Sequence, residues 1–171
     1  MAMTSPRRQP RRIGATEDLD DPVSTLSAVA QNYLKVIWTT REWSQERISI
    51  QLLSEKIGVS TSTVSNVIRK LSDQGLVDHS RHRGIALTDA GRTAAVEMVR
   101  RHRLIETYLA DYLGYGWDEV HDEAEVLEHA VSGLMIARMV AKLGHPTRDP
   151  HRDPIPAADG GDPLLPARPL G

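Results

Sequence analysis

The sequence predicts a mainly α-helical protein with one small β-hairpin, and three observations predict this fold. Two short segments with helical periodicity are joined by a glycine-containing turn. A pair of short strand-like runs with a basic tip follows them. Two longer helical segments come next, separated by the break Gly114-Tyr115-Gly116.

The first helix is expected after a polar arm. Residues 1–22 are charged and rich in Pro and Arg, which is typical of a disordered segment. From Ser24 onward, apolar residues recur at helical spacing as far as Trp38. The pattern fades in the polar stretch TTREWSQER, and we expect the helix to end there.

The second and third helices are short and carry clear end signals. We expect one helix from Ile48 to Ile57, with Ser49 as its N-cap and Gly58 at its end. Ser60 can cap the next helix, which runs to about Gln74. Both helices place their apolar residues on one face, so both are expected to pack on a common core.

The remaining elements follow in order. The runs LVDHS and IALTD flank Arg81-His82-Arg83-Gly84 and predict a β-hairpin. Thr88 can cap a long helix over 89–113, and a last helix is expected from about Trp117 to Leu143. Seven of the ten prolines lie beyond Gly144, so the tail over 146–171 is expected to be extended or disordered.

Composition excludes several classes of protein. The net charge of -2 gives no overall signature of a polyanion-binding protein, so any nucleic-acid surface must be a local patch. The absence of cysteine excludes disulfides, thiolate metal sites and cysteine nucleophiles. No apolar run approaches the roughly 20 residues that a membrane-spanning helix needs. We expect a soluble cytoplasmic protein with no membrane partner.

Residues 23–90 have the layout of a winged helix-turn-helix, which favours binding of double-stranded DNA. Short polar side chains on the second helix of the pair can enter the major groove, and basic side chains can hold the phosphate backbone. The candidate DNA-binding residues are Ser60, Ser62, Thr63, Ser65, Asn66, Arg69 and Lys70 on the helix, and Arg81 and Arg83 on the wing. The alternative is a Ser/Thr-rich helix start that only caps itself.

The segment HDEAEVLEH carries the second functional signal. In a helix, His121, Glu125, Glu128 and His129 fall at i, i+4, i+7 and i+8 and share one face. Two imidazoles and two carboxylates are costly to bury unless a cation compensates them, and Mn, Fe and Zn accept this ligand set. A further pair, His102 and Glu106, occurs at i, i+4 in the preceding helix. The alternative is a solvated helix face with ordinary charged pairs.

A winged helix followed by these His and Glu residues resembles the diphtheria toxin repressor family of metal-dependent transcriptional repressors, and most closely its manganese-dependent branch. The resemblance covers about residues 24–157, from AVAQNYLKVIW through VRRHRLIETYL and VHDEAEVLEHAVS to DPHRDPIP. It implies a homodimer that binds a palindromic operator when metal is bound and represses metal-homeostasis genes.

Transferred residue by residue, the resemblance implies two metal sites. The ancillary site comprises His102, Glu106 and His121, and the primary site comprises Asn32, Glu125, Glu128 and His129. Iron sensors have cysteine at the position of Glu125 and manganese sensors have glutamate, which implies Mn²⁺, with Fe²⁺, Zn²⁺ and Co²⁺ as alternatives. Asn32 departs from the pattern, since aspartate is expected there in a manganese sensor and methionine in an iron sensor. Its uncharged amide oxygen implies weaker metal binding.

The family organisation assigns residues 91–145 to a helical metal-binding and dimerisation domain. Apolar residues for its core and for a dimer interface are Leu104, Leu109, Val126, Leu127, Ala130, Leu134 and Met135. We expect the SH3-like third domain usual in this branch to be absent, and His145 and His151 in the tail to be solvated.

Three alternatives to a manganese-dependent repressor stay open. An iron-dependent repressor of the same family would use the same ligands, and a constitutive winged-helix DNA binder would keep a degenerate metal site. A metallohydrolase needs an open coordination position and a general base. The chain has no HExxH motif, so we do not expect an enzyme.

Overall fold

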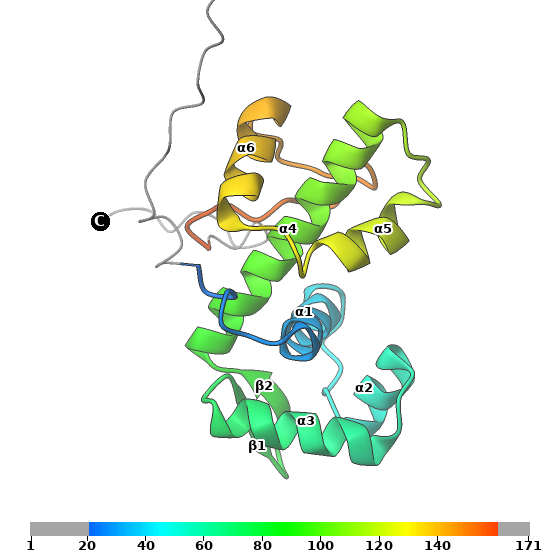
Figure 1. Ribbon diagram of the computed structural model, residues 1–171. Coiled ribbons are helices and arrows are strands. Elements are labelled where there is room, and N and C mark those ends of the chain that lie inside the picture. The colour runs from blue at the N-terminus through cyan, green and yellow to red at the C-terminus, as the bar shows by residue number, and fades with distance from the viewer. Residues whose placement is uncertain (1–20, 161–171) are drawn as a thin grey trace, which may run out of the picture.

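The computed structural model describes residues 21–160, and its organising element is the long helix α4 (Asp89–Leu113). This helix runs through the molecule from the hairpin end to the opposite end (Figure 1). Helix α1 (Ala28–Trp43) packs across its middle, and α5 (Val120–Leu127) and α6 (Gly133–Leu143) pack on its C-terminal half. Within the described residues, every helix is too short or too polar to cross a bilayer. The mainly helical fold class is confirmed.

The other end of α4 carries the winged helix-turn-helix. Helices α2 (Ile50–Ile57) and α3 (Thr61–Asp73) pack together below α1, and strands β1 (Val77–Ser80) and β2 (Gly84–Leu87) form the antiparallel wing (Figure 1). One hydrophobic core joins α1, α2, α3, the wing and the first half of α4, and a second core joins α5, α6 and the rest of α4. Helix α4 is therefore shared by both halves of the molecule.

The predicted caps form. The side-chain oxygens of Ser49, Ser60 and Thr88 accept hydrogen bonds from backbone N–H groups three residues on, at 3.1, 3.2 and 3.1 Å. Gly58 ends α2 and Gly114 ends α4 in left-handed conformations, with φ of 77° and 72°. These ends are local signals, which explains why they were readable from the sequence.

One helix end is correct and one helix prediction is wrong. Helix α1 ends at Trp43, within the polar stretch where we expect its end, and Glu42 on that last turn pairs with a buried arginine of α4. The single helix expected up to Leu143 is two helices, α5 and α6, joined by a turn over 128–132. The side chain of Ser132 accepts from the N–H of Met135 at 3.2 Å and so caps a new helix.

The segments outside the helices are partly packed. Asp21, which we assigned to the N-terminal arm, lies 2.7 Å from Arg101 of α4. In the tail, Ile155 is buried in the second core and pairs by its N–H with the carbonyl of Thr147 at 2.9 Å. The rest of the arm and of the Pro-rich tail, residues 1–20 and 161–171, lies outside the described residues.

The first turn of α4 lies so close to the wing that it requires glycine. A Cβ on Gly91 would lie 1.8 Å from the carbonyl oxygen of Leu76, a backbone atom that cannot rotate away. We expect Gly91→Ala to lower the free energy of unfolding by about 1–3 kcal/mol in a urea titration, because overpacking forces backbone shifts. Gly133→Ala is the matched control on another helix, since its Cβ would meet its nearest atom at 3.8 Å. Equal stability of the two variants would contradict the close approach.

Candidate metal centre

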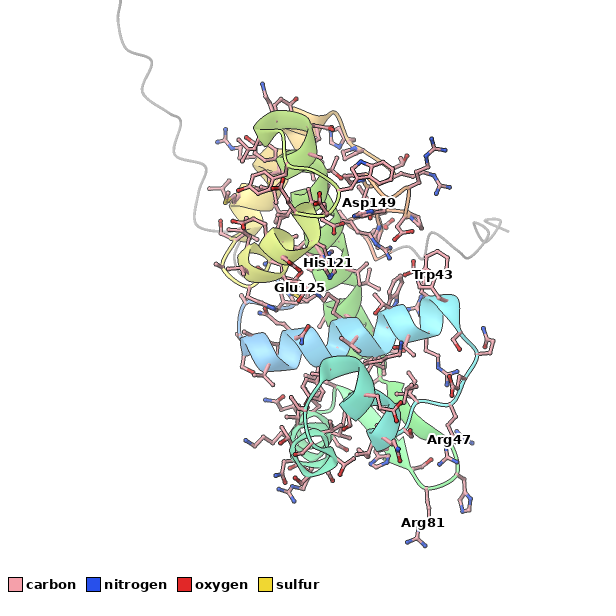
Figure 2. The ribbon with its side chains drawn as sticks, turned by 90° about the vertical axis from the view of Figure 1, so that its right-hand side faces the viewer. Trp43, Arg47, Arg81, His121, Glu125 and Asp149 are labelled. Carbon is pink, nitrogen blue, oxygen red and sulfur yellow. The ribbon has the colours of Figure 1, made fainter. Side chains whose placement is uncertain are left out.

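Helices α1, α4 and α5 converge beside a cavity of about 520 Å³. Figure 2 shows His121 and Glu125 directed from α5 toward this junction, with Asp149 of the tail nearby. The cavity is lined by Asn32, Lys35, Val36, Thr39, Trp43, Lys56, Ile57, Val99, His102, Arg103, Glu106, His121, Glu125, Asp149, His151 and Asp153. Five of the seven predicted metal ligands are on its wall, and they come from all three helices.

The predicted ancillary set is brought together. The Nε2 atom of His102 lies 3.0 Å from Glu106 Oε1 and 3.1 Å from His121 Nδ1, and the latter is 3.4 Å from Glu106 Oε1. His102 and Glu106 are buried, whereas the side chain of His121 is 60% exposed. One ligand atom from each residue lies within 4.8 Å of the others, which suits a single cation.

A second cluster joins His102 to Glu125 and Glu128, again with ligand atoms within 4.8 Å of one another. The Nδ1 atom of His102 is 2.5 Å from Glu128 Oε2, and the Glu128 side chain is fully buried. His102 therefore faces one cluster with each ring nitrogen. From the sequence alone, His102 is expected in the ancillary site only.

The other two predicted primary ligands lie at the edge of this cluster. His129 follows α5 in the turn, where its Nδ1 lies 2.8 Å from Gln31 Oε1 of α1 and its Nε2 lies 3.4 Å from Glu128 Oε1. Asn32 is half-buried on the cavity wall. These two residues stay predicted ligands.

The charges of the two clusters depend on one another. Burial alone would lower the pKa of His102, but hydrogen bonds to Glu106 and Glu128 raise it to about 9. Burial would raise the pKa of Glu106, yet the His102 partner holds it below its ordinary value. The pKa of Glu125 is likewise lowered, against burial, by the ammonium group of Lys35. His102 is therefore protonated at neutral pH in this arrangement, and a metal that binds it must release a proton.

The donor set fits a divalent transition metal. Three carboxylates and two imidazoles are held on packed helices, and Glu106 and Glu128 are among the most buried polar residues described. Such a set of nitrogen and oxygen donors, without sulfur, suits Mn²⁺, and it also accepts Fe²⁺, Zn²⁺ and Co²⁺. Buried carboxylates clustered in this way need cations as partners.

Sequence reasoning missed two contributions from the tail. His151, which we expected to be solvated, places Nε2 3.8 Å from Glu106 Oε1 and packs edge-on against Trp117. Asp149 is buried on the same wall, and burial raises its pKa. Nothing in the local pattern of DPHRDPIP signals this, because only the return of the tail onto α4 brings these residues to the cavity.

Lys35 on α1 is a further residue that the sequence pattern did not reveal. Its ammonium group contacts the two glutamates of the second cluster. A signal existed, since Lys35 follows Asn32 by three residues and therefore shares its helix face.

The predicted DNA-facing side chains lie on the other side of α1. All seven candidates on α3 and its cap are exposed, whereas Val64, Ile68 and Leu71 hold the helix to the core. At the wing, Arg81 and Arg83 are exposed, and Figure 2 shows Arg81 at the tip with Arg47 beside it. The guanidinium of Arg47 donates to the carbonyl of Arg81, a contact that the sequence analysis did not anticipate.

Comparison with known proteins identifies both halves of the chain. Residues 25–85 match the family model "Iron dependent repressor, N-terminal DNA binding domain", and residues 88–157 match "Iron dependent repressor, metal binding and dimerisation domain". The iron-dependent repressor IdeR of Mycobacterium tuberculosis is 33% identical over 134 residues, which is 78% of this chain and 58% of that protein. The diphtheria toxin repressor of Corynebacterium diphtheriae is 34% identical over 127 residues, 74% of this chain and 56% of that protein.

Solved structures are also similar. A manganese-dependent transcriptional repressor in complex with manganese is 65% identical, with a TM-score of 0.75, over 81% of this chain and 64% of that one. The manganese regulator SloR is 40% identical, with a TM-score of 0.70, over 80% of this chain and 62% of that one. The chain thus spans less than two thirds of the length of each relative.

Proposed function

Because this chain belongs to the iron-dependent repressor family, the family of the diphtheria toxin repressor, we propose that it is a manganese-responsive repressor of metal-homeostasis genes. It binds palindromic operator DNA as a homodimer when divalent metal is bound. The observation that carries this proposal is the convergence of His102, Glu106, Glu125 and Glu128 against α1, a helix of the DNA-binding domain.

The metal ligands lie on both domains. Glu125, Glu128 and His129 would hold the primary site from α5 and the turn that follows it, and Asn32 would complete it from α1. His102, Glu106 and His121 hold the ancillary site, where His151 adds a nitrogen donor from the tail. When bound, a divalent cation neutralises these carboxylates and ties α1 to the second domain. Asn32 would be the ligand on α1, so its bond to the metal would fix the orientation of the winged helix-turn-helix relative to the dimer axis.

Manganese is favoured over iron by the oxygen donors of the primary site. Glu125 supplies a carboxylate and the chain has no cysteine, and hard oxygen ligands suit Mn²⁺ better than a thiolate does. The 65% identity to a manganese-dependent repressor supports the same choice. The curated relatives that are iron-dependent keep Fe²⁺ as the second candidate.

DNA recognition and dimerisation use separate surfaces. The exposed start of α3 enters the major groove, and Arg81 and Arg83 contact the backbone or the minor groove. Of the predicted interface residues, Val126, Leu134 and Met135 are 71, 41 and 47% exposed, which leaves an apolar face for a second copy. Leu104 and Leu109 are buried in the core of the metal-binding domain instead. A DNA-binding regulator of this kind works in the cytoplasm and is not an enzyme.

The test is capture of genomic DNA fragments of the source organism by the protein, once with Mn²⁺ and once with a chelator. We expect a palindromic sequence to be enriched with Mn²⁺ and not with the chelator, and to be enriched less strongly when Fe²⁺ replaces Mn²⁺ under anaerobic conditions. Equal enrichment with the chelator would instead favour a constitutive DNA binder with a degenerate metal site.

A further inference from the structure

Lys35 places its ammonium group between two predicted metal ligands. Its Nζ atom donates to Glu125 Oε1 and to Glu128 Oε1, each at 2.6 Å. The side chains of Lys35 and Glu128 are 8% and 0% exposed, so this is an ion pair largely withdrawn from water. Lys35 belongs to α1 and the two glutamates belong to α5 and its C-cap, so the contact joins the DNA-binding domain to the metal-binding domain.

The ammonium group and a metal ion need the same space. A cation chelated by these two carboxylate oxygens must lie close to both, and that is where Nζ lies. An ammonium group and a metal ion that both contact the same two carboxylate oxygens would repel each other strongly in a buried site. The displaced Lys35 side chain has space to move into, because it lines the cavity of about 520 Å³ beside the cluster.

We propose that Lys35 is an internal counter-ion that a metal ion displaces, and that it sets the metal affinity of the Glu125–Glu128 site. Without metal, the ammonium compensates two carboxylates that would otherwise repel each other inside the protein. Binding of metal is then an exchange of one cation for another. The metal affinity of the site is therefore lower than its carboxylates would give without Lys35. This inference rests on the proposed metal-responsive function.

The first test compares Mn²⁺ binding by the full chain and by Lys35→Met, with free Mn²⁺ followed by its electron paramagnetic resonance signal. Removal of the competing charge should tighten Mn²⁺ binding at the Glu125–Glu128 site by about tenfold or more, the scale on which neighbouring charges shift proton affinities. Lys56→Met is the matched control, because Lys56 lines the same cavity but is exposed. Its Mn²⁺ affinity should stay close to that of the unaltered protein.

The outcomes separate the two claims. If the unaltered protein binds no Mn²⁺, the proposed function fails and this inference fails with it. If the unaltered protein binds Mn²⁺ but Lys35→Met binds it equally or more weakly, only the displacement is overturned.

A second measurement decides the matter if Lys35→Met does not fold. Reductive methylation of the unaltered protein, read by mass spectrometry, reports how accessible each lysine amine is. Added Mn²⁺ should raise the methylation rate of Lys35 severalfold and leave that of Lys56 unchanged. A Lys35 rate that Mn²⁺ leaves unchanged, in protein shown to bind Mn²⁺, would overturn the displacement.

Discussion

Glu128→Gln should strongly weaken metal-dependent DNA binding while leaving the dimer intact. Glu128 is fully buried, and its two oxygens face Lys35 at 2.6 Å and His102 at 2.5 Å. Glutamine has nearly the same shape but no charge, so it removes the carboxylate that both the metal and His102 need. We expect the Mn²⁺ concentration for half-maximal operator binding to rise by about 100-fold or more, the upper range for changes around metal ligands.

Glu123→Gln is the matched control for this experiment. It makes the same change of charge on the same helix, but Glu123 is exposed to solvent. Operator binding can be followed by fluorescence anisotropy and the oligomeric state by light scattering. An unchanged Mn²⁺ requirement in folded, dimeric Glu128→Gln would remove Glu128 from the metal centre.

The second large effect is expected at Arg103. Its guanidinium donates to both Glu42 oxygens at 3.1 and 2.7 Å and to the carbonyl of Pro154 at 2.7 Å, and it lies 5.8 Å from the ring of Trp38. The Arg103 side chain is 6% exposed and that of Glu42 is fully buried. One residue of α4 thus holds the end of α1 and the tail that carries Asp149 and His151.

Arg103→Met should lower the free energy of unfolding by about 3–5 kcal/mol, because it leaves the Glu42 carboxylate buried and unpaired. Arg100→Met serves as the control, since the ion pair of Arg100 within residues 21–160 is a longer 3.9 Å contact with Glu97. Adding Glu42→Leu to Arg103→Met should recover much of the loss, because the unpaired charge disappears. Urea titrations measure all three variants. A small loss, or no recovery in the double variant, would argue against an unpaired charge as the cause.

Local signals explain how much of this fold was predictable. The caps at Ser49, Ser60 and Thr88 were correct because an N-cap is decided by a few neighbouring residues. The break after α5 was missed because apolar residues continue at helical spacing across it, through Leu127 and Val131. Periodicity describes which face is apolar, and it does not reveal where a helix stops.

The candidate site was predictable to the extent that its residues share a helix. The i, i+4 pairs on α4 and α5 were identified, and packing brought them together. The position of His102 between two clusters depends on how α5 packs against α4. The position of Lys35 between Glu125 and Glu128 depends on how α1 crosses α4. The approach of His151 depends on the return of the tail. These are tertiary relations, which a pattern along one chain does not contain.

The central claim is that metal binding and DNA binding are coupled, and their reciprocity tests it most directly. Mn²⁺ affinity should be measured with and without the captured operator duplex, and operator affinity with and without saturating Mn²⁺. Coupled sites must change each other's affinity by the same factor, and coupling of 1–3 kcal/mol predicts a factor of roughly 5–150. Equal factors in this range would establish the metal-switched repressor. A Mn²⁺ affinity that the duplex leaves unchanged, together with an operator affinity that Mn²⁺ leaves unchanged, would contradict it.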